Sequence, residues 1–176
     1  MKTKDMVYAG LFAAVTAALG LLIIPIQPVP ITGQSMGPML AGSILGSRVG
    51  GLSLLIFDLL VAAGVPVLAG GRGGLGIILG PTGGYIISWP IAAYVIGKIV
   101  EQKREKSLLF YFIANVLGGI VIVYFIGVLW LSFQQGLDFK TALFEGALIF
   151  IPGDMVKAAA ASITARSLSK VISVKD

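Results

Sequence analysis

Two residues of opposite charge, Asp154 and Lys157, lie three positions apart in the otherwise apolar segment IPGDMVKAAAAS. On a helix they would share one face, about one turn apart. Charges inside a membrane segment are costly and imply a partner or a function. The two could form a structural ion pair, or each could face an external pocket and bind a ligand group of opposite polarity. Asp58 is a further charge in an apolar segment and needs the same explanation.

A glycine-rich segment carries the next candidate. Residues 70–85 read GGRGGLGIILGPTGGY, with eight glycines in sixteen positions. So many glycines are costly in entropy unless the chain must turn tightly or let another group approach closely. The guanidinium of Arg72 is suited to a carboxylate or phosphate, and the alternative is a solvated loop cation. We therefore expect this segment to be functional.

Neutral side chains add weaker candidates. Tyr85 and Trp89 lie four residues apart, either as aromatics of the membrane interface, which is the interpretation we favour, or as a wall for a flat ligand. Thr32 and Gln34 could offer hydrogen bonds to a ligand. Asn115 could do the same, or could bond a neighbouring helix.

Composition fixes the class of protein. The 176 residues are 57% hydrophobic and 12% charged, with a mean hydropathy of +0.98, which predicts an all-α integral membrane protein. Because the chain has no histidine and no cysteine, we expect no metal site, no cofactor and no enzymatic activity. The basic residues are scattered between apolar runs, which argues against nucleic acid. No GxxxxGK[ST] motif is present, so energy for any transport must come from a partner or an ion gradient.

The apolar stretches predict a six-transmembrane-helix bundle in a single membrane domain covering 1–176. The expected helices are about 7–24, 35–46, 49–63, 84–100, 107–131 and 140–171, given that roughly 20 residues cross the hydrocarbon core. The connecting loops 25–34, 64–83 and 132–139 would then cap one side of the bundle. These loops include the glycine-rich segment.

Basic residues orient this bundle in the bilayer. With both termini in the cytoplasm, ten of the thirteen basic residues lie inside, as the positive-inside rule requires. They are Lys2, Lys4, Arg48, Lys98, Lys103, Arg104, Lys106, Arg166, Lys170 and Lys175. The sequence therefore predicts a multi-pass protein of the cell membrane whose elaborate loops face outward.

Small residues recur at every fourth position in several helices, and such faces let helices approach closely in lipid. They could pack within the bundle or against another subunit. The sets are Ala9, Ala13 and Ala17, with Gly10, Ala14 and Ala18 beside them; Gly33, Gly37 and Ala41; and Gly42, Gly46 and Gly50. We select Ala9, Ala13 and Ala17 as the best candidate for a partner interface.

Three segments closely resemble the BioY family, the biotin-specific S components of energy-coupling factor (ECF) transporters. They are PVPIT at 28–32, GLSLLIFDLLVAAGVPVLAGGRGGLGIILGPTGGY at 51–85 and PGDMVKAAAA at 152–161. The resemblance implies a subunit that captures biotin in a pocket capped by external loops. It also implies a transmembrane T component and two cytoplasmic ABC-type ATPases as partners, with the alanine face of the first helix as the T-component contact.

Biotin has a carboxylate on an apolar arm and a ureido ring with two N–H donors and one carbonyl. The resemblance implies that Lys157 or Arg72 binds the carboxylate and that Asp154 accepts a ureido N–H. Gly83 and Gly84 would let the backbone approach the ring, and Tyr85 would pack against it. Asp58 departs from the apolar residue expected at its position.

The alternative function is an autonomous ion-coupled transporter of small solutes. Such a protein needs carboxylates for the coupling ion and usually has repeated halves, and residues 1–88 show no clear repeat in 89–176. A membrane enzyme lacks support because no nucleophile lies beside a base. A purely structural scaffold has little use for an arginine in an external glycine loop.

Overall fold

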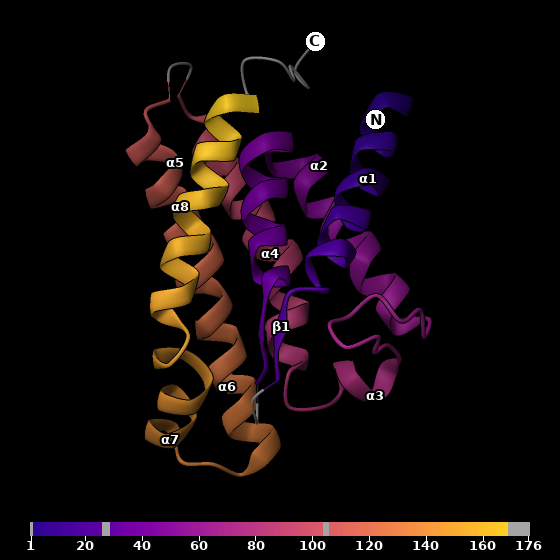
Figure 1. Cartoon of the computed structure of the whole chain (residues 1–176), viewed down its shortest axis with the longest axis vertical. Coiled ribbons are helices and arrows are strands. Elements are labelled where there is room, and N and C mark those ends of the chain that lie inside the picture. Colours follow the sequence, from indigo (N-terminus) through magenta and orange to yellow (C-terminus); the bar gives the residue numbers. More distant parts are fainter. Residues whose placement is uncertain (1, 26–28, 104–105, 169–176) are drawn as a thin grey trace.

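The computed structural model describes residues 2–25, 29–103 and 106–168, which form a bundle of helices with one small hairpin (Figure 1). The helices are α1 Thr3–Leu19, α2 Met36–Ala62, α3 Leu75–Ile78, α4 Gly83–Glu101, α5 Leu108–Val116, α6 Val123–Gln135, α7 Phe139–Leu143 and α8 Ile151–Leu168. The strands β1 Ile23–Ile24 and β2 Ile31–Thr32 pair antiparallel. A 3-10 turn, η1 Gly33–Ser35, and two π-helices, η2 Leu117–Ile122 and η3 Phe144–Leu148, complete the set.

The predicted all-α membrane fold is confirmed. Among the described residues, three helical stretches are long and apolar enough to cross a bilayer: Gly33–Ala62, Gly83–Glu101 and Leu108–Gln135. The stretches Phe139–Leu148 and Ile151–Leu168 supply a fourth if counted together, although they are bent by 42°. The start of α1 and the end of α8 lie at one end of the bundle, and α3 and the α6–α7 connection lie at the other (Figure 1).

The chain folds back on itself inside α2. The sequence predicted separate helices at 35–46 and 49–63, and the structure joins them through the single residue Gly46, whose φ of 81° and ψ of −176° are almost confined to glycine. A Cβ added at Gly50 would lie 2.7 Å from the carbonyl oxygen of Ala41, nine positions earlier. Glycine at these positions therefore lets two short antiparallel segments pack backbone to backbone.

Helix boundaries differ from the predicted ones where local chemistry intervenes. α1 starts at Thr3 because the Lys2 amide donates to the Asp5 carboxylate at 2.9 Å, and it ends before Gly20. The apolar residues 23–24 therefore belong to the hairpin and not to the first helix. The helix predicted at 107–131 runs through η2 to Gln135 and ends at Gly136, which is left-handed with a φ of 64°. Residues 169–171 of the last predicted helix lie outside the described residues.

The two small-residue faces of α1 point in different directions. Ala9 is 0% and Ala13 is 3% exposed, and both belong to the hydrophobic core. The neighbouring face of Gly10, Ala14 and Ala18 is exposed. The choice of Ala9, Ala13 and Ala17 as the partner-facing surface is therefore wrong for Ala9 and Ala13, because these residues are covered by the bundle itself.

We expect Gly46→Ala to lower the free energy of unfolding by about 1–3 kcal/mol, because a side chain is strained in this backbone conformation. Its Cβ would also lie 2.6 Å from Oε1 of Glu101, which accepts a 2.8 Å hydrogen bond from the Ser47 amide. Thermal unfolding in detergent measures the effect. Gly10→Ala is the matched control, because nothing lies within 4 Å of an added Cβ there. Equal unfolding temperatures for the two variants would contradict the expectation.

Candidate ligand-binding site

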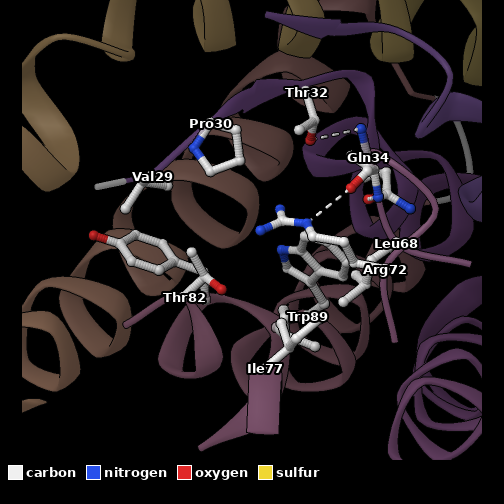
Figure 2. A pocket seen from close by; sticks show the side chains of 12 residues that line it. Val29, Pro30, Thr32, Gln34, Leu68, Arg72, Ile77, Thr82 and Trp89 are labelled. Carbon is white, nitrogen blue, oxygen red and sulfur yellow. Dashed lines mark hydrogen bonds between the residues drawn. The ribbon is translucent and has the colours of Figure 1, made fainter. Parts of the chain in front are cut away.

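Two adjoining cavities lie between the β1–β2 hairpin and α4 and share one wall. The wall consists of Val29, Pro30, Thr32, Tyr85 and Trp89. One cavity, of about 400 Å³ including its open side, extends to Arg72 in the glycine-rich segment (Figure 2). The other, of about 440 Å³ including its open side, extends to Asp154 and Lys157 on α8. Because the two cavities share these lining residues, we infer that they form one elongated pocket with a mostly apolar middle and a polar group at each end.

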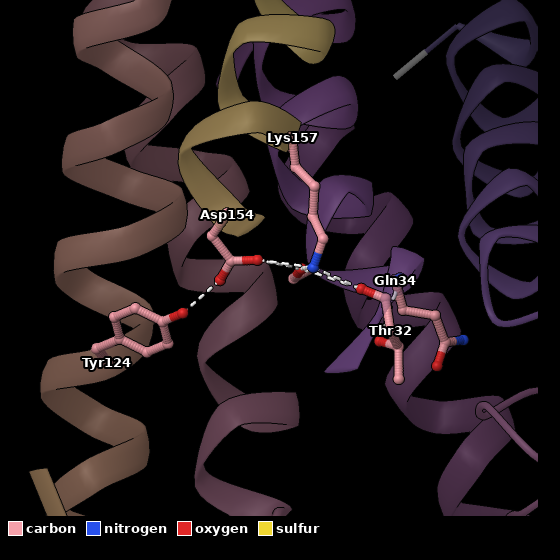
Figure 3. Close-up of polar contacts among 6 residues, drawn as sticks. Thr32, Gln34, Tyr124, Asp154 and Lys157 are labelled. Carbon is pink, nitrogen blue, oxygen red and sulfur yellow. Dashed lines mark hydrogen bonds and ion pairs between the residues drawn. The ribbon is translucent and has the colours of Figure 1, made fainter. Parts of the chain in front are cut away.

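Asp154 anchors the first end of the pocket (Figure 3). Its side chain is 7% exposed and forms an ion pair with Lys157 at 2.7 Å. The hydroxyl of Ser35 donates to the same carboxylate oxygen at 3.1 Å, and the hydroxyl of Tyr124 donates to the other oxygen. The carboxylate thus has partners from three different parts of the fold, as a buried charge requires.

Lys157 links this carboxylate to the hairpin. Its ammonium donates to the Thr32 carbonyl at 2.7 Å and to the Ser35 hydroxyl at 2.9 Å, in addition to Asp154. An ammonium has three N–H donors, so these contacts occupy all of them. The structural ion pair and the pocket-facing position, which the sequence presented as alternatives, are both present.

The bend before α8 places Asp154 in the first turn of that helix, where the helix dipole favours a negative charge. The preceding π-helix η3 leaves the Gly146 carbonyl able to accept a 2.9 Å hydrogen bond from the Tyr85 hydroxyl. Tyr85 therefore ties α4 to the bend and lines both cavities at the same time.

Gln34 is 1% exposed and ties its own turn to α1 and to the segment 67–69 at the Arg72 end of the pocket. Its amide nitrogen donates to the carbonyls of Thr16 at 3.2 Å and Val67 at 2.9 Å. Its amide oxygen accepts from the Ala69 amide at 2.9 Å. Both N–H donors are occupied by the protein, so a direct bond from Gln34 to a ligand stays a prediction.

Arg72 is exposed at the opposite end from Asp154. It closes a tight turn in which Gly70 and Gly71 both have positive φ and the Leu68 amide donates to the Arg72 carbonyl at 2.9 Å. Its Nε donates to the Ala69 carbonyl at 3.1 Å, which orients the guanidinium along the pocket rim (Figure 2). Arg72 is therefore exposed, as a solvated loop cation would be, but its side chain is bonded to the turn and does not extend freely into solvent.

The aromatic pair predicted for the membrane interface lies inside the protein. Tyr85 and Trp89 are each 6% exposed, and both line the pocket. The Trp89 ring contacts that of Phe57 with centroids 5.8 Å apart. The favoured interface interpretation was therefore wrong, and the alternative of a wall describes the structure.

Other predicted residues stand away from the cavities. A Cβ at Gly83 would collide with the Ile78 carbonyl, and one at Gly84 with the Trp130 side chain. These glycines permit close packing at the start of α4, and a role against a ligand stays a prediction. Asn115 is 0% exposed, accepts from Ser43 at 2.8 Å and donates to Ser162 at 2.9 Å. It therefore bonds neighbouring helices, the second of its two alternatives.

Known proteins match this chain over nearly its whole length. The sequence pattern of the BioY family matches residues 1–174. The chain is 45% identical over 178 residues to the biotin transporter BioY of Rhizobium etli, covering 96% of this chain and 94% of that protein. The chain belongs to the BioY family. It is also 38% identical over 179 residues to the probable biotin transporter BioY of Bacillus subtilis, covering 100% and 96% of the two chains.

A solved structure supports the BioY fold independently of these names. The crystal structure of the S-component for biotin from an ECF-type ABC transporter is 37% identical to this chain, with a TM-score of 0.92. The match covers 99% of this chain and 97% of that chain. The family resemblance found from the sequence motifs is thereby confirmed.

Two residues of this candidate site were missed by the sequence reasoning. Ser35 was the first residue of the helix predicted at 35–46 and was not considered as a site residue, although it bonds both members of the ion pair. Tyr124 lies in an apolar helix, where a tyrosine is hard to distinguish from a lipid-facing aromatic. The useful signal would have been the need of Asp154 for hydrogen-bond donors other than Lys157.

Asp58 stands apart from the pocket. It lies in the second half of α2 and is half-buried. Within the described residues, its Oδ1 atom is buried without a hydrogen-bond partner. The structure therefore gives no bonded partner to the Oδ1 atom of this carboxylate, and its role stays open.

We expect Gln34→Leu to destabilise the ligand-free protein by about 1–3 kcal/mol, because the substitution leaves the Ala69 amide and two carbonyls without partners. The unfolding temperature in detergent measures this loss. Gln135→Leu is the matched control, because Gln135 is an exposed glutamine on α6 whose side chain has no hydrogen bond within the described residues. An unchanged unfolding temperature for the Gln34 variant would show that these three bonds are dispensable.

Proposed function

We propose that this protein is the substrate-binding S subunit of an ECF-type transporter, capturing biotin from outside the cell and delivering it inward. The observation that carries the proposal is the elongated pocket with a hydrogen-bonding pair at one end, an apolar wall and an exposed arginine at the other. Biotin has the matching sequence of groups: a ureido ring, an apolar bicycle and arm, and a carboxylate. The names of the related proteins support the same ligand.

Counting hydrogen bonds assigns the ureido ring to the Asp154 end. A carboxylate offers about four acceptor sites, and Asp154 uses three of them for Lys157, Ser35 and Tyr124. One site remains for a ligand N–H, which would form a charge-assisted bond in a largely dehydrated place. The alternative, a ligand carboxylate at this end, would meet the negative charge of Asp154.

The same counting assigns the carboxylate to Arg72. Lys157 must give up a bond to the protein before it can bind a ligand anion. Arg72 has five donors, and its recorded side-chain bond uses Nε alone. This ranks Arg72 above Lys157, a choice that the sequence left open. Between the two ends, Tyr85 and Trp89 offer flat apolar surface to the ring and arm.

The family resemblance implies the partners. An S subunit of this kind works with a T component and two cytoplasmic ABC-type ATPases, which would supply the ATP-binding loop that this sequence does not contain. We place the T component against the exposed face of Gly10, Ala14 and Ala18 on α1. The termini then lie in the cytoplasm, consistent with the basic residues Lys2, Lys4, Arg48 and Lys98 at that end.

The orientation of the ligand is testable with paired ligands. Arg72→Gln should weaken biotin binding by up to about fivefold, because an exposed ion pair is worth no more than about 1 kcal/mol. The same variant should bind biotin methyl ester as the unaltered protein does. Asp154→Asn should weaken both ligands equally and by more, because it removes a buried charge-assisted acceptor. Isothermal titration of the purified protein gives all four affinities.

If biotin bound in the reverse orientation, with its carboxylate at Lys157, the affinities would change in a different pattern. There, Lys157→Gln would affect biotin more than its methyl ester, and Arg72→Gln would affect neither. If Asp154→Asn unfolds the protein, Tyr124→Phe tests the same end of the pocket with a smaller change, because it removes one donor to that carboxylate.

Ala14→Leu should abolish ATP-dependent biotin uptake by cells while leaving the affinity of the isolated subunit unchanged. The added side chain would keep a partner helix from close approach at the exposed face of α1. Radiolabelled uptake with the full transporter and binding to the isolated protein measure the two properties. Ala160→Leu, the same change at an exposed position of α8, is the matched control. Lost affinity in the Ala14 variant would refute a role confined to partner contact.

A further inference from the structure

We propose that the pocket selects its ligand strictly at the ureido ring and permissively at the carboxyl end, so that the protein also binds biotin amides extended beyond the carboxyl carbon. This inference rests on the proposed function and defines its substrate class. It follows from the different surroundings of the two ends of the pocket.

The Arg72 end continues into a third hollow that opens to the outside. The hollow shares Pro30, Ala69, Arg72, Ile77 and Thr82 with the first cavity. With the cavity at Asp154 and Lys157 it shares Pro30 alone. A ligand tail that passes Arg72 therefore enters open space and not the protein interior.

Small residues line this hollow. Gly70, Gly76 and Gly80 contribute to it beside alanine and proline side chains, and it encloses about 1000 Å³ including its open side. A Cβ added at Gly76 would meet nothing within 4 Å. Arg72 is the charged residue among those that line the hollow in the described part of the chain. An amide-linked extension would thus meet neither a steric barrier nor a negative charge there.

The Asp154 end has no comparable space. The Asp154 side chain is 7% exposed, and Lys157 bonds the Thr32 carbonyl of the hairpin. A substituent on a ureido nitrogen would remove the N–H that Asp154 accepts and would have to displace one of these bonded groups. Desolvated polar groups left unpaired reject a ligand strongly, whereas loss of an ion pair at an exposed site is mild.

Competition against radiolabelled biotin on the purified chain tests the inference. The competitors are biotin, biotin ethylamide, biotinyl-lysine and biotin methylated on a ureido nitrogen. We expect the two amides to bind within about tenfold of biotin, because each loses only the exposed ion pair with Arg72. We expect the ring-methylated compound to bind at least about a hundredfold more weakly, because it leaves a buried acceptor unpaired.

A variant that fills the third hollow tests whether the extended ligands bind there. Gly76→Phe should weaken biotinyl-lysine by at least about tenfold and leave biotin within about threefold of its original affinity. Gly10→Phe is the matched control, because an added Cβ there also meets nothing within 4 Å and the residue is on α1. It should change neither ligand.

The outcomes separate this inference from the proposed function. Tight biotin binding with both amides excluded would overturn the inference and keep the biotin site. An equal loss of biotin and biotinyl-lysine in Gly76→Phe would also overturn it, because the hollow would then belong to the site of biotin itself. Failure of biotin to bind the folded chain would overturn the proposed function, and this inference with it.

Discussion

A charge inside a membrane protein is costly unless other groups bond it, and the structure around Asp154 and Lys157 follows from that constraint. The pair takes a hydroxyl from Tyr124 on α6, a carbonyl from the hairpin strand β2, and a hydroxyl from the η1 turn that follows it. Two residues on one helix thereby fix the relative positions of three elements. An apolar pair of similar size would relieve the cost of burial, but it would also leave this end of the pocket without polar groups.

Close packing by glycine serves the same pocket in a second way. A side chain at Gly127 would collide with the Tyr85 ring, and one at Gly146 would collide with its hydroxyl. These two glycines create the space in which Tyr85 stands between α4, α6 and the bend before α8. The position of Tyr85 in the aromatic wall therefore depends on glycines in the segments opposite it. In a bilayer, such close van der Waals packing drives helix association.

Sequence reasoning predicted the fold class and named several residues that line the pocket, among them Arg72, Asp154 and Lys157, because hydropathy and isolated charges are local properties. It failed where the answer depended on which way a helix face points. Ala9 and Ala14 belong to equally plausible small-residue faces, and their sequence spacing does not tell which one the bundle covers. Trp89 similarly fits either an interface or a core. The hairpin residues Ile23 and Ile24 continue an apolar run, so nothing in their hydropathy marks the end of α1.

The ion pair also sets how the site responds to the membrane potential. Asp154 and Lys157 cancel, so among the charged residues that line the three hollows in the described part of the chain, Arg72 leaves a formal charge of +1. A bound carboxylate brings that sum to zero. An elementary charge crossing the membrane field exchanges roughly 2.3 kcal/mol per 100 mV. The charges of the site would therefore contribute to a voltage dependence of the empty site and barely to one of the loaded site.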